Sequence, residues 1–205
     1  MTDYTAARHA MVDCQVRPSD VTRYAIIEAM LWCPRERFVS KNRRDVAYAG
    51  VEIELAPGRV LLEPRSFAKM LEVARIGADD LVLDLAPGSG YSTAVIARMA
   101  EAVIAIEPDP ELSKWAQDLL AELEVDNAVV SQGEPANGDP DHGPFDVIFI
   151  NGAIEVLPQA LIEQLKPGGR LVALFREGSV GKCRVVTRSG DAVSRHYVFD
   201  ADAPV

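Results

Sequence analysis

The spacing of apolar and polar positions predicts helices in the first part of the chain. Apolar residues recur at helical spacing in three segments, residues 4–16, 20–32 and 64–75. Ser19 or Asp20 is expected to cap the second helix, and Pro64 suits the first turn of the third. Between these two helices no long periodicity appears, and Pro57 with Gly58 marks a turn.

From residue 81 onward, short apolar runs alternate with helical segments. The predicted strands are residues 81–85, 103–106, 128–130, 145–150 and 170–175, and the predicted helices are residues 91–99, 110–123 and 158–165. This alternation is typical of a parallel sheet covered by helices on both faces. Two further apolar runs, residues 183–187 and 193–199, flank Ser189-Gly190-Asp191 and leave no room for a helix. They predict a C-terminal antiparallel hairpin.

The sequence therefore predicts a single α/β domain. Residues 1–64 are expected to form a helical layer that packs on a Rossmann-like core of residues 65–205. A chain of 205 residues, with 48% apolar and 25% charged residues, is large enough for one such core. The N-terminus lacks a basic region followed by an apolar one, and no apolar run approaches the roughly 20 residues of a membrane span. We expect a cytoplasmic protein with no membrane partner.

Charge and the rarer residues exclude several functions. The formal net charge of −10 makes nucleic acid a poor partner. The histidines and cysteines stand far apart without metal-ligand spacing, so no metal site is expected; they are His9, His142, His196, Cys14, Cys33 and Cys183. The thiols are interpreted as small buried or half-buried groups in a reducing compartment. One basic cluster, interpreted as a solvated helix face rather than an anion site, comprises Arg35, Arg37, Lys41, Arg43 and Arg44.

A turn of small residues follows the first predicted strand. The stretch LDLAPGSGYS carries Asp84, Ala86, Gly88 and Gly90 in the pattern D-x-[G/A]-x-G-x-G, which resembles the motif of class I S-adenosylmethionine-dependent methyltransferases. The dinucleotide-binding pattern G-x-G-x-x-G would need a third glycine where Thr93 stands. The pattern favours S-adenosylmethionine as cofactor, with S-adenosylhomocysteine as product, over a nicotinamide.

Acids and amides at later strand ends extend the predicted site. Asp84 can face the ammonium of the cofactor, and Glu107 can accept both ribose hydroxyls. Glu134 follows the third strand, where an adenine would lie, and Asn151 ends the fourth. Asn151 precedes Gly152-Ala153 rather than the Pro-Pro-aromatic of amino methyltransferases. The expected cofactor contacts are Asp84, Ala86, Pro87, Gly88, Ser89, Gly90, Tyr91, Glu107, Pro108, Glu134 and Asn151.

The chain from Met11 to Leu174 resembles the protein-L-isoaspartate O-methyltransferase family. Four stretches carry the likeness: MVDCQVRPSDV, CPRERFVSKNRRDVAYAG, VLDLAPGSGYSTAVIA and GAIEVLPQALIEQLKPGGRLVAL. The resemblance implies a class I methyltransferase fold with an extra N-terminal helical layer. It also implies a protein-repair activity, in which a methyl group is transferred to the free carboxylate of isoaspartate in damaged proteins.

One segment departs from the family pattern G-Q-T-I-S-x-P. It reads Gly58-Arg59-Val60-Leu61-Leu62-Glu63-Pro64, so Val60 and Leu62 replace the threonine and the serine. The family places that serine hydroxyl near the accepting carboxylate, and leucine makes no hydrogen bond. A carboxylate is ionised at pH 7, so no general base is required and no catalytic residue is assigned. Arg59, Leu62 and Asn151 are the acceptor-side candidates, although Arg59 and Arg65 are interpreted first as solvated surface arginines.

Three functions stay open at this point. The first is an O-methyltransferase that acts on a carboxylate of a protein, a peptide or a small molecule. The second is a relative that binds S-adenosylmethionine but is inactive on isoaspartate, with another acceptor or a regulatory role. The third, a nicotinamide-dependent oxidoreductase, is disfavoured by the missing third glycine.

Overall fold

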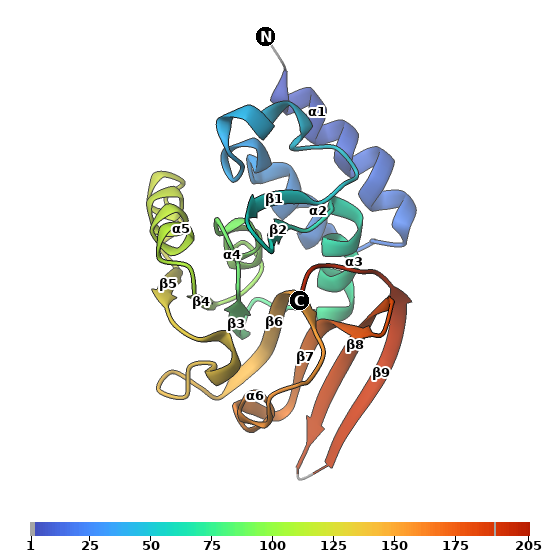
Figure 1. Cartoon of the computed structure of the whole chain (residues 1–205), viewed down its shortest axis with the longest axis vertical. Coiled ribbons are helices and arrows are strands. Elements are labelled where there is room, and N and C mark those ends of the chain that lie inside the picture. Colours follow the sequence, from blue (N-terminus) through green and yellow to red (C-terminus); the bar gives the residue numbers. More distant parts are fainter. Residues whose placement is uncertain (1–2, 191) are drawn as a thin grey trace.

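The N-terminal part of the chain forms a helical layer and a small hairpin. The computed structural model describes residues 3–190 and 192–205. Helix α1 (Tyr4–Met11) continues through a π-helical turn (Val12–Val16) and a 3₁₀ turn (Arg17–Ser19), and α2 (Tyr24–Trp32) follows. Two further 3₁₀ turns (Arg35–Arg37 and Lys41–Val46) lead to strands β1 (Ile53–Ala56) and β2 (Arg59–Leu61), which pair with each other and with no other strand of the described chain. Figure 1 shows these elements above the main sheet.

The main sheet has seven strands in the order β5-β4-β3-β6-β7-β8-β9. The strands are β3 (Leu81–Leu85), β4 (Ala102–Glu107), β5 (Ala128–Gln132), β6 (Phe145–Ile154), β7 (Leu165–Glu177), β8 (Val180–Ser189) and β9 (Ala192–Asp200). Strands β3 to β7 pair in parallel, and β8 and β9 add an antiparallel pair at one edge. The predicted fold class and the C-terminal hairpin are confirmed. Asp191, in the predicted hairpin turn, lies outside the described residues.

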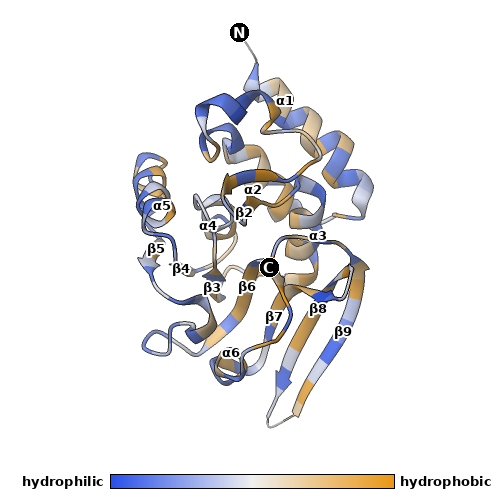
Figure 2. Ribbon diagram, in the orientation of Figure 1, coloured by the Kyte–Doolittle hydropathy of each residue, from blue (hydrophilic) through white to orange (hydrophobic). Residues whose placement is uncertain are grey.

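Helices cover the two faces of this sheet unequally. One face packs against α3 (Pro64–Ala74), α4 (Tyr91–Ala97) and α5 (Pro110–Glu122), and the short α6 (Gln159–Glu163) lies against the other. The alternation of a strand explains the division, because Val147 and Phe149 join the first core while Ile148 and Ile150 join the second. Figure 2 shows β6 and β7 rich in hydrophobic residues, whereas α5 mixes both kinds.

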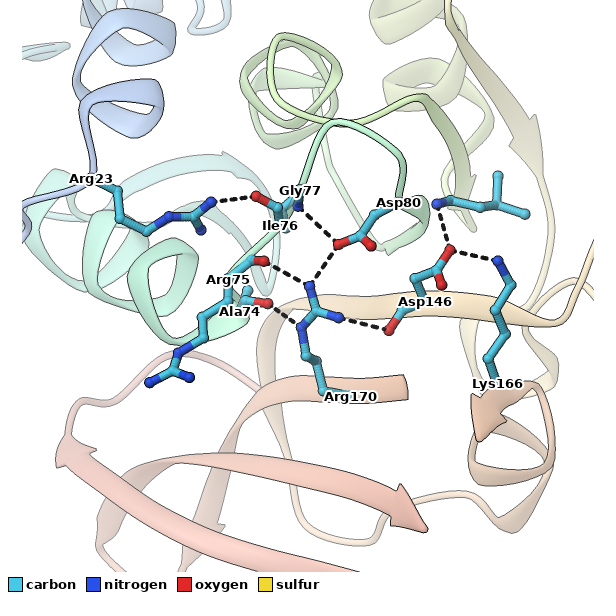
Figure 3. A network of polar contacts seen from close by, with 10 residues as sticks. Arg23, Ala74, Arg75, Ile76, Gly77, Asp80, Asp146, Lys166 and Arg170 are labelled. Atoms are coloured by element: carbon cyan, nitrogen blue, oxygen red, sulfur yellow. Dashed lines mark hydrogen bonds and ion pairs between the residues drawn. The ribbon is translucent and has the colours of Figure 1, made fainter. Parts of the chain in front are cut away.

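A polar network at the amino ends of the strands fixes α3 against the sheet. Arg170 on β7 donates to the backbone carbonyls of Ala74 and Arg75 and forms a 2.6 Å ion pair with Asp80. Asp146 accepts from the Leu81 backbone at 2.8 Å and pairs with Lys166 at 2.7 Å. Figure 3 shows these contacts converging from four separate segments. The network lies at the opposite strand ends from the glycine turn, so it supports the core rather than the site.

Two local predictions differ from the structure. Helix α2 begins at Tyr24 without a side-chain cap, and neither Ser19 nor Asp20 caps it. Instead, the Glu72 carboxylate on α3 accepts from the backbone N–H groups of Thr22 and Arg23, so a tertiary contact satisfies this helix start. The second difference is the β1–β2 hairpin, which the sequence pattern predicted only as a turn at residues 57 and 58.

None of the helices in the described part of the chain combines the length and apolarity needed to cross a bilayer.

Candidate functional site

The turn from β3 to α4 holds its backbone in conformations that favour small residues. Ala86, Gly88 and Gly90 have positive φ angles of 56°, 61° and 91°. A Cβ on Gly88 would lie 2.6 Å from Cδ1 of Leu55 on the β1–β2 hairpin, and one on Gly90 would lie 2.8 Å from Cβ of Ala116. The glycines therefore permit close approach of the hairpin and of α5 to this turn.

Asp84 is the penultimate residue of β3 and is completely buried. Its carboxylate accepts hydrogen bonds from Ser92 Oγ at 2.8 Å, Thr93 Oγ1 at 2.7 Å and Asn151 Nδ2 at 2.6 Å. Burial raises the pKa of Asp84 from 3.8 to about 6, and the three hydrogen bonds oppose that shift. Asn151 thus joins the predicted site through Asp84, as the adjacency of β3 and β6 requires.

Glu107 ends β4 and is also completely buried. Arg59 on β2 binds it in a bidentate fashion, with Nη1 2.7 Å from Oε1 and Nη2 2.8 Å from Oε2. The backbone N–H groups of Gly88 and Asp109 donate to the same carboxylate at 2.7 and 3.1 Å. The interpretation of Arg59 as a solvated surface residue is wrong, because the ion pair draws the guanidinium inward. Arg65, in contrast, is exposed as predicted.

The remaining cofactor candidates lie around this edge of the sheet. Ser89 is buried and donates from Oγ to the carbonyl of Phe38, while Pro108 is half-buried. Glu134 is exposed and lines a cavity of about 410 Å³ together with Leu85 and Ile150. The carbonyl of Pro204, near the C-terminus, accepts a 2.9 Å hydrogen bond from the Ala153 backbone beside that cavity. The structure brings the predicted residues together; their contacts with a cofactor stay a prediction.

A second, much smaller cavity of about 10 Å³ lies beside Leu62 and Asn151, two of the predicted acceptor-side residues. Its walls include Arg35, Leu62, Pro87, Tyr91 and Asn151. Leu62 is 3% exposed, so it is a core residue, and its backbone carbonyl accepts a 2.6 Å hydrogen bond from Arg35 Nη2. The Tyr91 ring packs against Phe38 and Phe67, and its hydroxyl has no hydrogen-bond partner among the described residues.

Arg35 contradicts the interpretation of the basic stretch as a solvated face. It is completely buried, its Nε donates to the Ala47 carbonyl at 2.7 Å, and its guanidinium lies 4.9 Å from the centre of the Tyr91 ring. Within residues 3–190 and 192–205 it forms no ion pair, and Nη1 has no partner. Burial lowers the pKa of Arg35. Arg37 pairs with Glu122, and Lys41 and Arg43 are exposed.

Sequence reasoning missed four participants in this site: Arg35, Leu55, Ser92 and Thr93. Ser92 and Thr93 lie in the first turn of α4, directly after the glycine turn. Two hydroxyl residues at this place are a sequence signal for hydrogen-bond donors to the acid that precedes the turn. Leu55 and Arg35 give no such local signal. The thiols also differ in part from the prediction, since Cys33 and Cys183 are buried but Cys14 is exposed.

The parallel sheet, the small-residue turn after β3, and buried acids at the ends of β3 and β4 define a class I S-adenosylmethionine-dependent methyltransferase. Residues 7–199 match the family model described as protein-L-isoaspartate(D-aspartate) O-methyltransferase. This chain belongs to that family.

Individual relatives agree with the family match. A protein-L-isoaspartate O-methyltransferase of Gloeobacter violaceus is 40% identical over 92% of this chain and 93% of its own length. One of Pelotomaculum thermopropionicum is 35% identical over 90% of this chain and 80% of its own. Among solved structures, a protein-L-isoaspartate O-methyltransferase superposes with a TM-score of 0.84 at 20% identity, covering 98% of this chain and 65% of that chain.

A Plasmodium falciparum structure assigned to the same type of enzyme was solved in complex with S-adenosyl-L-homocysteine. It superposes with a TM-score of 0.81 at 16% identity, over 100% of this chain and 98% of its own. Membership of this methyltransferase family makes S-adenosylmethionine the cofactor of this chain. The residues present fit this cofactor chemically. The Asp84 carboxylate suits its ammonium group, the Glu107 carboxylate suits the two ribose hydroxyls, and the small-residue turn lies between them. Leu55, however, packs close to Gly88 in that turn, and Arg59 forms an ion pair with Glu107.

Proposed function

We propose that this chain transfers a methyl group from S-adenosylmethionine to a carboxylate, and that isoaspartate in a peptide or protein is the first acceptor to test. The family membership and the names of the relatives support this substrate class. The observation that carries the proposal is Arg35, a buried cation without an acid partner that lines the acceptor-side cavity.

The two buried acids support one placement of the cofactor. In this placement its ammonium faces Asp84, its ribose hydroxyls face Glu107, and its adenine extends toward Glu134 and the larger cavity. A buried carboxylate attracts a cation strongly because little water screens the charge. With these ends fixed, the reactive group of the cofactor falls near Asn151 and Tyr91, which are the residues shared with the acceptor-side cavity.

The cofactor supplies a methyl group on a positively charged sulfur, which is an electrophile without further activation. The protein has to align an acceptor oxygen and to exclude water from it. A carboxylate acceptor has a pKa near ~4 and needs no base at neutral pH. This agrees with a cavity wall that offers a cation, a phenol and an amide, and that includes no histidine, lysine or carboxylate among its described residues to act as a general base.

An acceptor carboxylate would satisfy the groups that are unpartnered here. Arg35 Nη1 and the Tyr91 hydroxyl are buried donors that form no hydrogen bond of normal geometry with the described residues, although the two side chains contact each other. A buried donor left unpaired costs about 1–3 kcal/mol, and a charged one costs more. An anion that reaches this cavity gains both contacts, while a neutral acceptor gains less. The cavity of about 10 Å³ is smaller than a carboxylate, so Leu62 must shift for the acceptor to enter.

Leu62 and Val60 oppose the standard isoaspartyl reaction. They stand where the family pattern has a serine and a threonine, and Leu62 is core. The missing hydroxyl at position 62 leaves the incoming carboxylate with one partner fewer, at a cost on the order of 1–3 kcal/mol. We therefore expect isoaspartyl methylation that is slower than that of a relative with both hydroxyls.

The test is methyl transfer from radiolabelled S-adenosylmethionine to an isoaspartyl peptide, with the aspartyl peptide of the same sequence as control. Base-labile label on the isoaspartyl peptide alone supports the proposal. Calorimetry of S-adenosyl-L-homocysteine in the same preparation shows whether the cofactor binds. Binding without transfer to any carboxylate would contradict the proposed acceptor class.

Val60 and Leu62, in place of the two hydroxyls of the family pattern, favour a second candidate, a relative that binds the cofactor without methylating isoaspartate. The double variant Val60→Thr/Leu62→Ser restores the hydroxyls of the family pattern and separates the two. If the wild type is silent on the isoaspartyl peptide and the double variant is active, the natural chain has another acceptor or a regulatory role. A fold check by circular dichroism accompanies it, because Leu62→Ser opens the core.

A further inference from the structure

The contact between Arg59 and Glu107 saturates the carboxylate on which the ribose depends. Oε1 accepts from Arg59 Nη1 and the Asp109 backbone, and Oε2 accepts from Arg59 Nη2 and the Gly88 backbone. A carboxylate offers about four lone-pair positions, and four N–H donors fill them here. A ribose diol needs two of these positions, and only the two guanidinium bonds can be released without rebuilding the turns of the main sheet.

The same hairpin covers the turn beside Glu107. Leu55 on β1 approaches Gly88 so closely that a Cβ there would lie 2.6 Å from the leucine Cδ1. Arg59 also donates to the Ala86 carbonyl at 3.1 Å, so the hairpin contacts both ends of the turn. One strand thus places an apolar side chain, and the other a cation, on the surface that would receive the cofactor.

The hairpin is held by few backbone pairings, although Ile53 and Leu61 anchor it to the core. Strands β1 and β2 have four and three residues, their register is interrupted by a bulge, and they pair with no strand of the main sheet in the described chain. A two-stranded hairpin of this size is marginally stable by itself. Its position therefore depends on side-chain contacts such as that of Arg59, which a ligand can replace.

We propose that Arg59 is an internal competitor for the ribose subsite and thereby sets the affinity of this chain for its cofactor. The cofactor binds only the state in which the hairpin has withdrawn Arg59 and Leu55. The apparent dissociation constant then equals the intrinsic one divided by the fraction of molecules in that state. The proposal rests on the placement of the ribose at Glu107 given under Proposed function.

The experiment is calorimetric titration of S-adenosyl-L-homocysteine into the wild type, Arg59→Gln, Arg59→Ala and a matched control, Arg17→Ala. Arg17 forms an exposed ion pair with Asp13 at 3.1 Å, so its replacement makes the same change in charge away from the site. We expect both Arg59 variants to bind about tenfold tighter or more, and the control to bind like the wild type. Hydrogen exchange of residues 53–61 should rise in the wild type when the ligand is added.

Each remaining outcome has a distinct meaning. Equal or weaker binding by both Arg59 variants, with a wild type that binds, would overturn the competitor role while leaving the proposed function intact. Protection of residues 53–61 on ligand addition would also overturn it, because the hairpin would then close on the ligand. If neither the wild type nor either folded Arg59 variant binds S-adenosyl-L-homocysteine, the proposed placement of the cofactor ribose at Glu107 is refuted.

Discussion

Asn151 Nδ2 donates a 2.6 Å hydrogen bond to Oδ1 of Asp84 and a 3.1 Å bond to the carbonyl of Leu85, which ties the second half of β6 to the end of β3. The two residues are 67 positions apart in the chain. Because Asp84 is completely buried, this amide helps to keep its carboxylate ionised.

We expect Asn151→Ala to weaken cofactor binding at pH 7. The change removes a hydrogen bond to a buried charge, worth about 1.5–3 kcal/mol, and raises the pKa of Asp84 further. Affinity for S-adenosyl-L-homocysteine should fall by about 10- to 100-fold in calorimetry. Asn42→Ala, at an exposed position far from the site, is the control. Equal affinities for the two variants would show that the amide does not act through Asp84.

The raised pKa of Asp84 predicts a specific dependence of stability on pH. With a pKa of about 6 in the folded state and an ordinary value of 3.8, the folded protein binds more protons between about pH 4 and 6. The free energy of unfolding contributed by Asp84 should therefore decrease as the pH rises through this window. The change is on the order of 3 kcal/mol. The free energies of unfolding of the wild type and Asp84→Asn, measured by urea titration, should differ by an amount that changes with pH only within this window. A difference that stays constant from pH 4 to 6 would contradict the raised pKa of Asp84.

The ionisation of Asp84 also predicts how cofactor affinity depends on pH. The carboxylate attracts the cofactor ammonium only when it is ionised, so affinity should fall as the pH drops below about 6. In Asp84→Asn the affinity should be low throughout and nearly independent of pH. Calorimetry of S-adenosyl-L-homocysteine between pH 5 and 8 measures both slopes, and a wild type that binds equally at the two extremes would refute the pairing.

Glu107→Ala should abolish detectable cofactor binding, because the neighbouring acid, Asp109, caps the start of α5 with its carboxylate and cannot replace Glu107 as acceptor of the ribose hydroxyls. Glu107→Gln preserves the shape and tests the charge alone, and it should weaken binding by about tenfold or more. Both variants are measured by calorimetry after a fold check. Unchanged affinity in Glu107→Ala would exclude the placement of the ribose.

Arg35 and Arg37 lie two residues apart and should differ widely in their contribution to stability. Arg35→Met leaves the buried carbonyls of Ala47 and Leu62 without their donor, which should lower the free energy of unfolding by about 2 kcal/mol. Arg37→Met removes a partly exposed ion pair with Glu122 and should cost less than about 1 kcal/mol. Urea denaturation measures both. A larger loss in Arg37→Met than in Arg35→Met would contradict this division.

The sequence by itself determined the sheet, its cofactor edge and the acids on it. Apolar runs alternating with helical segments predict parallel strands, and the carboxyl ends of parallel strands meet at one edge. Asp84, Glu107 and Asn151 each follow such a run directly, so their positions are fixed by local pattern. The turn with Gly88 and Gly90 is likewise a local feature, because its backbone conformation requires small residues.

Only the tertiary structure decided what these acids contact. Arg59 reaches Glu107 across 48 residues, and Arg35 reaches the carbonyl of Leu62 across 27. Neither pairing leaves a periodic signal, since the hairpin is too short to show alternation and a buried arginine has the same letter as a solvated one. Burial and partner depend on how the N-terminal layer packs over the sheet, and that packing is a property of the whole chain.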